Sequence, residues 1–307
     1  MESLSIVIVN YKTWDNLTLC LESILNQNEI NLEVIVVDNN SNDNEISIFK
    51  KKYKWVHWVE NSKNYGFAKA CNIGASLIKS KWSLFLNPDT ILESNSISSL
   101  IKYCNINTDH RIIGIKQFNQ KQNHTNSFGI FLNFWTLSGL FRSLIRINRG
   151  SYKSMNLKKI ANPDWISGSF LLLRKKDFDL LNGWDENYWM YYEDMDLCKR
   201  AEKFKLKVSL LNNWSCTHFH GKASRKNNEL KIITKSEVII SSHIYLEKHS
   251  KKSIKYLNHL LLIFFQFIEL VIIGIFSKSK RKILEKSMNY WIRGLSQNVW
   301  ESDRAKI

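Results

Sequence analysis

The strongest constraint on the fold is a repeated alternation of strand-like and helix-like segments between residues 4 and 86. Short apolar runs typical of buried strands occupy residues 4–9, 32–38, 56–60 and 81–86. Between them lie segments whose apolar residues are spaced as in a helix, at residues 15–27, 44–52 and 68–78. The run 32–38 is almost continuously apolar, as expected of a strand covered on both faces. This alternation predicts an α/β fold with a mostly parallel, open sheet flanked by helices.

Short polar residues follow three of these predicted strands. Residues 10–11 (Asn-Tyr) follow the first strand, residues 38–41 (Asp-Asn-Asn-Ser) the second, and residues 87–89 (Asn-Pro-Asp) the fourth. In open parallel sheets, ligands bind beyond the carboxyl ends of the strands. Asn and Asp are also common turn residues. From the spacing alone, a binding site and a set of ordinary turns are equally open.

Composition narrows the choice of partners. The formal net charge is +16 in 307 residues, which favours nucleotides, nucleic acid or an anionic membrane surface. The five cysteines are scattered without a C-x-x-C pair, which argues against a disulfide framework or a zinc cluster. The N-terminal apolar run is expected to be a strand and not part of a signal peptide, so we expect the catalytic part in the cytosol.

The last 75 or so residues differ from the rest. A helix is expected at 231–249, and residues 257–276 form an apolar segment just long enough to span a bilayer. Glu269 within it makes a lipid-exposed span costly, so an interfacial helix on an anionic leaflet fits better. Basic residues flank the segment and favour this interpretation: Lys251, Lys252, Lys255, Lys278, Lys280, Arg281 and Lys282. A helix buried in a homodimer is the alternative.

Several short motifs occur in a fixed order along residues 4–250. They are SIVIVNYK (5–12), VVDNNSND (36–43), NYGFAKACNIG (64–74), LNPDT (86–90), SGSFLLLRKKDF (167–178), GWDENYWMYYEDMDLCKR (183–200) and HFHGKAS (218–224). Together they resemble family 2 glycosyltransferases with the GT-A fold, and most of all the bacterial rhamnosyltransferase-like branch. The resemblance implies a catalytic domain at 1–230, with a nucleotide-binding half at about 1–118 and an acceptor-binding half at about 119–230. A helical, membrane-associating region would follow at 231–307.

The resemblance implies a divalent cation, Mn²⁺ or Mg²⁺, against the donor diphosphate. GT-A enzymes usually carry Asp-x-Asp after the fourth strand, whereas this chain has Asn87-Pro88-Asp89 and keeps only the second acid. One carboxylate can suffice, because magnesium also binds substrate phosphates and water. His218 matches a second ligand in an H-x-x-G-x-x-S pattern, and its imidazole would suit manganese better than magnesium. His220 is the competing candidate.

The resemblance also implies which residues bind the donor, a dTDP- or UDP-linked sugar with rhamnose as the best match. The expected donor-binding residues are Asp38 at the base, Asn10 and Tyr11 beside the same pocket, Asn64, Gly66 and Lys69 beside base and ribose, and Asn87 at a donor hydroxyl.

Asp194 resembles the family's catalytic base, which takes a proton from the acceptor hydroxyl as that oxygen attacks the anomeric carbon. Glu193 is the alternative base, and Asp196 is expected to serve the helix. Acidic residues in a first helical turn are also favoured by the helix dipole alone. Trp184, Asp185 and Glu193 match acceptor-side positions, although Trp184 fits a core position equally well.

The expected function is an inverting glycosyltransferase that extends a lipid-linked bacterial surface glycan at the cytoplasmic face of the cell membrane. A sugar nucleotidyltransferase is one alternative, but that class needs a Gly-rich phosphate loop where this chain has NYKTWDN. A non-enzymatic nucleic-acid binder is another, but its clustered basic signature is missing because the lysines are dispersed. We therefore expect a glycan or glycolipid acceptor and no nucleic-acid partner.

Overall fold

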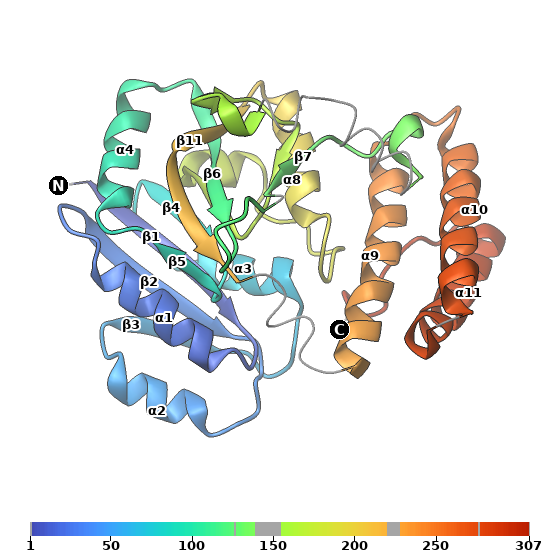
Figure 1. Ribbon diagram of the computed structural model, residues 1–307, viewed down its shortest axis with the longest axis horizontal. Coiled ribbons are helices and arrows are strands. Elements are labelled where there is room, and N and C mark those ends of the chain that lie inside the picture. Colours follow the sequence, from blue (N-terminus) through green and yellow to red (C-terminus); the bar gives the residue numbers. More distant parts are fainter. Residues whose placement is uncertain (1, 126, 139–154, 220–227, 276, 307) are drawn as a thin grey trace. The chain divides into compact units, whose positions relative to one another are not determined.

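A computed structural model describes residues 2–125, 127–138, 155–219, 228–275 and 277–306 (Figure 1). The chain divides into two compact units. The first comprises Met1–Ile130, Ser154–Asp185 and Glu193–Ala223, and the second comprises Phe131–Lys153, Glu186–Tyr192 and Ser224–Ile307. The domain boundary expected at residue 230 stays a prediction.

The first unit is built on a nine-stranded sheet, here called the main sheet. Its strand order is β3 (Val56–Glu60), β2 (Asn31–Asp38), β1 (Ser3–Asn10), β4 (Trp82–Leu86), β10 (Phe170–Arg174), β6 (His110–Phe118), β11 (Lys207–His218) and β5 (Thr90–Leu92), with β8 (Ile160–Ala161) paired to β11. A separate two-stranded sheet joins β7 (Phe128–Gly129) to β9 (Trp165–Ile166). The predicted open, mostly parallel sheet is confirmed; β10 runs antiparallel to both β4 and β6.

Helices cover both faces of the main sheet. Apolar residues of α1 (Trp14–Leu25), α2 (Glu45–Lys52) and α4 (Ser96–Ile106) form one core cluster with Ile6 and Ile8. On the other face, α3 (Phe67–Ala75) brings Gly74 against Val7 and Val37. Because neighbouring residues of a strand point to opposite faces, each face needs its own apolar cover. This explains the nearly continuous apolar runs in β1 and β2.

The observed elements depart from the predicted ones mainly after residue 86. β11 extends from Lys207 to His218, because a register shift between Leu211 and Ser215 lets it go on pairing with β6. β5, α4 and β6 fill residues 90–118, for which the sequence patterns gave no assignment. The first unit also contains α7 (Lys175–Leu180) and α8 (Glu193–Lys203). All five cysteines are buried and free, as expected.

The second unit is helical. It consists of a short 3₁₀ turn, η1 (Phe134–Thr136), and the helices α9 (Asn228–His249), α10 (Lys255–Gly274) and α11 (Lys278–Gln297). In the described part of the chain, α10 is the one helix that is long and apolar enough to cross a membrane, by length and composition. Several of its apolar side chains are exposed, among them Phe264 at 56% and Ile272 at 57%.

We expect Gly74→Ala to destabilise the first unit. A Cβ atom at this position would lie 2.6 Å from Val7 Cγ1 and 3.0 Å from Val37 Cγ2, and both valines sit in central strands. Overpacking of this kind costs about 1–3 kcal/mol. Gly274→Ala is the matched control, because its added Cβ meets nothing closer than 3.5 Å. Denaturant unfolding should give a lower free energy of unfolding for Gly74→Ala only; an equal change in both variants would contradict the packing described.

Candidate functional site

The predicted site residues of the main sheet gather at one edge. β1, β2, β4, β6 and β11 all run in the same direction, so their carboxyl ends lie at the same edge. Asn10, Asp38 and His218 are the last residues of three of these strands, and Asn87 follows a fourth. This is the edge where open α/β sheets bind ligands.

Asp89 and His218 form a buried pair at this edge, with exposures of 5% and 3%. His218 Nε2 lies 3.1 Å from Asp89 Oδ1. His218 Nδ1 lies 3.0 Å from Gln117 Oε1, and because an amide oxygen only accepts, Nδ1 carries the hydrogen. In the neutral ring, Nε2 then turns its lone pair toward the Asp89 carboxylate. Two buried acceptors that face each other repel, and a bound cation between them would relieve that repulsion.

Backbone hydrogen bonds fix the Asn87-Pro88-Asp89 segment. Asn87 N donates to Ser169 O at 3.0 Å, and Thr90 N closes the turn onto Asn87 O at 3.1 Å. Phe219 N donates to Asp89 O at 2.9 Å, just beyond the antiparallel pairing of His218 with Thr90. Asn87 Nδ2 lies 3.5 Å from His218 Nε2. The segment is therefore a turn and also presents its side chains to the imidazole.

Asn10 and Asp38 are engaged by their own loops. Asp38 accepts hydrogen bonds from Ser41 N at 2.9 Å, from Ser41 Oγ at 2.5 Å and from Asn10 Nδ2 at 3.2 Å. Asn10 Oδ1 accepts from Thr13 Oγ1 at 2.7 Å. Tyr11, which follows, is partly exposed. The two polar strand ends thus hold each other, and the expected role of Asp38 toward a base stays a prediction.

Asn39 connects this loop to the segment expected to bind the donor, although the sequence assigned it no role. Its Oδ1 accepts from Asn61 Nδ2 and Tyr65 N, both at 3.0 Å. Its Nδ2 donates to Asn64 Oδ1 at 2.9 Å and to Gly66 O at 3.0 Å. Gly66 has a φ of 82°, in the region that favours glycine, and it precedes the first residue of α3. The run of polar residues after β2 was the sequence signal that could have indicated a role for Asn39.

Two lysines place positive charge beside aromatic rings near these loops. Lys69 Nζ lies 4.5 Å from the centroid of the Tyr65 ring, and Lys12 Nζ lies 5.7 Å from that of Tyr11. Both distances suit cation–π attraction. The rings hold the two ammonium groups close to the residues expected to bind the donor.

Three acids in the first turn of α8 meet different surroundings. Asp196 is fully buried and pairs with Arg200 Nε at 2.7 Å, so it serves the helix. Asp194 Oδ2 accepts from Gly168 N at 3.2 Å, and its Oδ1 accepts from Met195 N at 2.8 Å. Burial raises the pKa of Asp194 to about 6, while these N–H groups oppose the rise.

Glu193 is the more confined of the two candidate bases. It is 7% exposed, and its Oε2 has no hydrogen-bond partner among the described residues. Burial first, and then the Asp194 charge, raise the pKa of Glu193 well above its usual value. These surroundings favour the neutral form of Glu193, whereas Asp194, with a pKa of about 6, is mostly ionised at neutral pH. Environments that separate two neighbouring acids in this way are typical of acid–base sites.

Gly168 and Ser169 link Asp194 to the Asn-Pro-Asp turn. Gly168 N binds Asp194, and the next carbonyl, Ser169 O, accepts from Asn87 N. The Ser169 hydroxyl lies 2.9 Å from Gln117 Nε2 and 3.0 Å from Gln117 Oε1. Sequence reasoning assigned no role to Gln117 or Ser169. A glutamine near the end of the apolar run 112–115 and the SGS motif were the signals for them.

Two other predicted positions differ in exposure. Trp184 is 1% exposed, and its ring packs 5.0 Å from that of Phe85 and 5.8 Å from that of Phe67. Asn72 holds its backbone, accepting from Trp184 N at 3.0 Å and donating to Trp184 O at 2.9 Å. Trp184 thus fills core, which was the alternative to stacking on a sugar, whereas Asp185 is partly exposed.

The competing ligand His220 lies outside the described residues, as do Gly221 and Ser224 of the H-x-x-G-x-x-S pattern. Among the described residues no cluster of three or more His, Cys, Asp or Glu side chains is placed to hold a metal ion. Among the described residues, Asp89 and His218 are the pair of potential cation ligands that this edge brings together.

Comparison with known proteins gives two family matches. The model described as glycosyl transferase family 2 matches residues 5–180. The model described as N-terminal domain of galactosyltransferase matches residues 152–222.

Similar proteins include two curated rhamnosyltransferases. The rhamnosyltransferase WbbL of Escherichia coli (strain K12) is 27% identical over 226 residues, covering 70% of this chain and 82% of WbbL. The N-acetylglucosaminyl-diphospho-decaprenol L-rhamnosyltransferase of Mycobacterium tuberculosis (strain CDC 1551 / Oshkosh) is 24% identical over 222 residues, covering 65% of this chain and 70% of the relative. The structure of GalNAc-T7 with UDP, GalNAc and Mn²⁺ aligns with a TM-score of 0.55 at 13% identity, over 84% of this chain and 53% of that one. That likeness supports the GT-A type of fold.

Asp194 should make stability depend on pH. Its pKa is about 6 in the folded chain against a usual value of 3.8, so the folded chain binds the proton more tightly. The free energy of unfolding should therefore fall as the pH rises from about 4 to about 6, by up to about 3 kcal/mol for a shift of about two units. We expect Asp194→Asn, which cannot ionise, to match the wild type at the acid end and to be more stable at neutral pH.

Urea unfolding across this pH range checks the expectation. Glu202→Gln, which removes an exposed acid from the same helix, is the control and should follow the wild type. A stability difference between Asp194→Asn and the wild type that stays constant with pH would show that Asp194 titrates normally.

Proposed function

The chain belongs to glycosyl transferase family 2, and from this premise we propose that it is an inverting, metal-dependent glycosyltransferase. It would move a sugar from a nucleotide-diphosphate sugar to an acceptor hydroxyl. The observation that carries the proposal is the buried Asp89–His218 pair, whose ring orientation is set by Gln117. The pair shares one sheet edge with Asp194, the candidate base, through the Gly168–Ser169 link.

In this proposal Asp194 is the general base. Its carboxylate takes the proton of the acceptor hydroxyl while that oxygen forms a bond to the anomeric carbon. The bond from the anomeric carbon to the diphosphate oxygen breaks, and the electron pair leaves with the nucleotide diphosphate. Attack from the face opposite the leaving group inverts the anomeric centre. Burial and the Asp194 charge raise the pKa of Glu193 well above its usual value, which favours its neutral form and leaves Asp194 as the candidate base.

Asp89 and His218 would hold the cation. When bound, a divalent cation neutralises charge on the departing diphosphate. The residues fit this group, because a carboxylate oxygen and an imidazole lone pair face each other in a buried place. The Nδ1–H bond to Gln117 is the kind of outer contact that orients a metal-ligating histidine. An imidazole ligand favours Mn²⁺ over Mg²⁺, and GalNAc-T7 was solved with Mn²⁺.

We further propose rhamnose as the sugar, carried on dTDP or UDP, and a lipid-linked bacterial surface glycan as the acceptor. Two relatives are rhamnosyltransferases, and the mycobacterial one is named for a decaprenyl-diphosphate-linked acceptor. The exposed apolar side chains of α10 and the lysines beside it suit a peripheral site on the cytoplasmic face of the membrane. A homodimer covering α10 is the alternative.

Asp194→Asn should abolish most turnover while the protein stays folded. A general base contributes about 10²- to 10⁴-fold, so kcat should fall by roughly that factor. In the wild type, kcat/KM should fall about tenfold per pH unit below pH 6, because protonated Asp194 cannot accept a proton.

Release of nucleotide diphosphate from a panel of dTDP- and UDP-sugars, with circular dichroism of each variant, measures this effect. Glu202→Gln should retain wild-type turnover. Undiminished transfer by folded Asp194→Asn would remove Asp194 from the mechanism.

Nucleotide binding should depend on metal through Asp89 and His218. We expect Mn²⁺-dependent binding of dTDP or UDP in calorimetry, loss of that binding in Asp89→Ala, and a roughly 10- to 100-fold loss in Gln117→Leu, which removes the partner of His218 Nδ1. Gln120→Leu, an exposed change just beyond β6, is the matched control and should bind like the wild type. Equal binding with Mn²⁺ and with EDTA would contradict the proposed cation site.

A further inference from the structure

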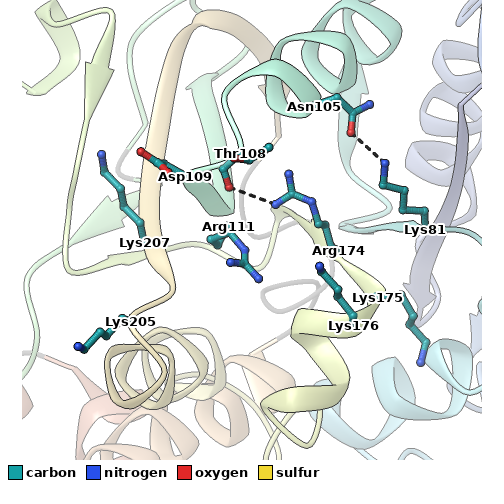
Figure 2. Close-up of a pocket in the computed structure, with 10 residues that line it drawn as sticks. All are labelled: Lys81, Asn105, Thr108, Asp109, Arg111, Arg174, Lys175, Lys176, Lys205 and Lys207. Atoms are coloured by element: carbon teal, nitrogen blue, oxygen red, sulfur yellow. Dashed lines mark hydrogen bonds between the residues drawn. The ribbon is translucent and has the colours of Figure 1, made fainter.

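A basic pocket of about 720 Å³ opens at the other edge of the main sheet (Figure 2). Seven of its ten lining residues are lysine or arginine, and one, Asp109, is acidic. Four of them lie at strand ends, where Lys81 precedes β4, Arg111 lies in β6, Lys207 begins β11 and Arg174 ends β10. The others come from α4, α7 and the turns beside the strands.

The length of the strands separates this pocket from the candidate active site. β6 runs from His110 at the basic edge to Phe118 at the other edge, eight residue steps of about 3.3 Å each. No residue that lines the pocket belongs to the set expected at the candidate site. The basic pocket therefore needs an explanation of its own.

The two guanidinium groups within the pocket have different partners. Arg111 pairs with Asp177, with Nε 2.8 Å from Oδ2. Arg174 is 6% exposed, lies 4.7 Å over the Trp82 ring and donates to Cys104 O at 3.1 Å. These contacts fix the Arg174 guanidinium without neutralising it. Burial, and then the Arg111 charge, lower the pKa of Arg174.

Three of the five lysines around these arginines add further unbalanced charge. Lys175 pairs with Asp179 at 2.6 Å, and Lys81 lies 3.9 Å from Glu2. Within the described part of the chain, Lys176, Lys205 and Lys207 have no ion pair with an acid. Cations crowded around one hollow repel each other, and an anion bound among them would relieve that repulsion.

The chemistry of the lining restricts the ligand. Ligand pockets are usually apolar with a few polar groups. Here the ten lining residues include no aromatic or aliphatic one, so a nucleobase would find no ring to stack on. Ammonium and guanidinium groups are the donors that recognise phosphate. We propose that this basic pocket binds a compact polyanion carrying two or more phosphate groups, either a soluble molecule or the headgroup of an anionic lipid.

The test compares two charge-reversed pairs in the full-length protein. Lys176→Glu/Lys207→Glu changes exposed lysines of the pocket, and Lys51→Glu/Lys54→Glu makes the same charge change at α2 and the residues after it. Each is titrated calorimetrically with inorganic pyrophosphate in EDTA and without nucleotide. We expect the pocket pair to bind at least about tenfold more weakly than the control pair, since charge-assisted hydrogen bonds are lost.

Two further variants keep the result decisive. Lys176→Gln/Lys207→Gln removes the charges without reversing them and should also weaken binding, which guards against misfolding of the glutamate pair. Asp89→Ala should bind pyrophosphate like the wild type, so failure of the proposed catalytic site would not be mistaken for failure of the pocket. No binding by the wild type, or an equal loss in the pocket and control pairs, would overturn the proposal.

Co-sedimentation with phosphatidylcholine vesicles, with and without cardiolipin, then separates the two sources of phosphate. A cardiolipin-dependent loss confined to the pocket pair would identify a lipid headgroup. Equal sedimentation of the pocket and control pairs, together with weakened pyrophosphate binding by the pocket pair, would identify a soluble polyphosphate.

Discussion

The arrangement of the candidate site depends on one hydrogen bond, from His218 Nδ1 to Gln117 Oε1. It decides which ring nitrogen carries the hydrogen and so turns the Nε2 lone pair toward Asp89. Gln117 is held by the Ser169 hydroxyl, and the Ser169 carbonyl holds the backbone of Asn87. Breaking the first bond would release the imidazole, whereas the turn that carries Asp89 would keep its own backbone bonds.

The two edges of the main sheet also carry different types of side chain. Its carboxyl edge carries amides, carboxylates and an imidazole, and its amino edge carries lysines and arginines. Parallel strands make this possible, because every strand delivers its two ends to the same two edges. The antiparallel strand β10 contributes to both: Gly168 and Ser169 precede it at the first edge, and Arg174 ends it at the second. One five-residue strand thus connects the surroundings of Asp194 with those of the basic pocket.

Sequence reasoning recovered what is encoded locally. Apolar runs located β1 to β4, and their polar ends located Asn10, Asp38 and Asn87, because strand ends follow directly from the change of pattern. Gln117 and Ser169 were missed since their importance comes from the insertion of β10 between β4 and β6, which joins residues 52 positions apart. The different surroundings of Glu193 and Asp194 were equally hidden, because burial of adjacent residues is set by tertiary packing. Whether Trp184 lies in the acceptor pocket or in the core was left open for the same reason.

The amide at Asn87 has a physical consequence for folding. A carboxylate there would put another negative charge near His218 Nε2, where Asn87 Nδ2 now lies at 3.5 Å, beside the already buried Asp89. Two acids close together in a buried turn repel each other and lose hydration, and both effects oppose folding. With the amide, a single carboxylate must be stabilised, and the amide group of Asn87 adds no charge of its own. The Asn-Pro-Asp turn can therefore form its hydrogen bonds to Ser169 and Phe219 as part of the sheet, independently of a ligand.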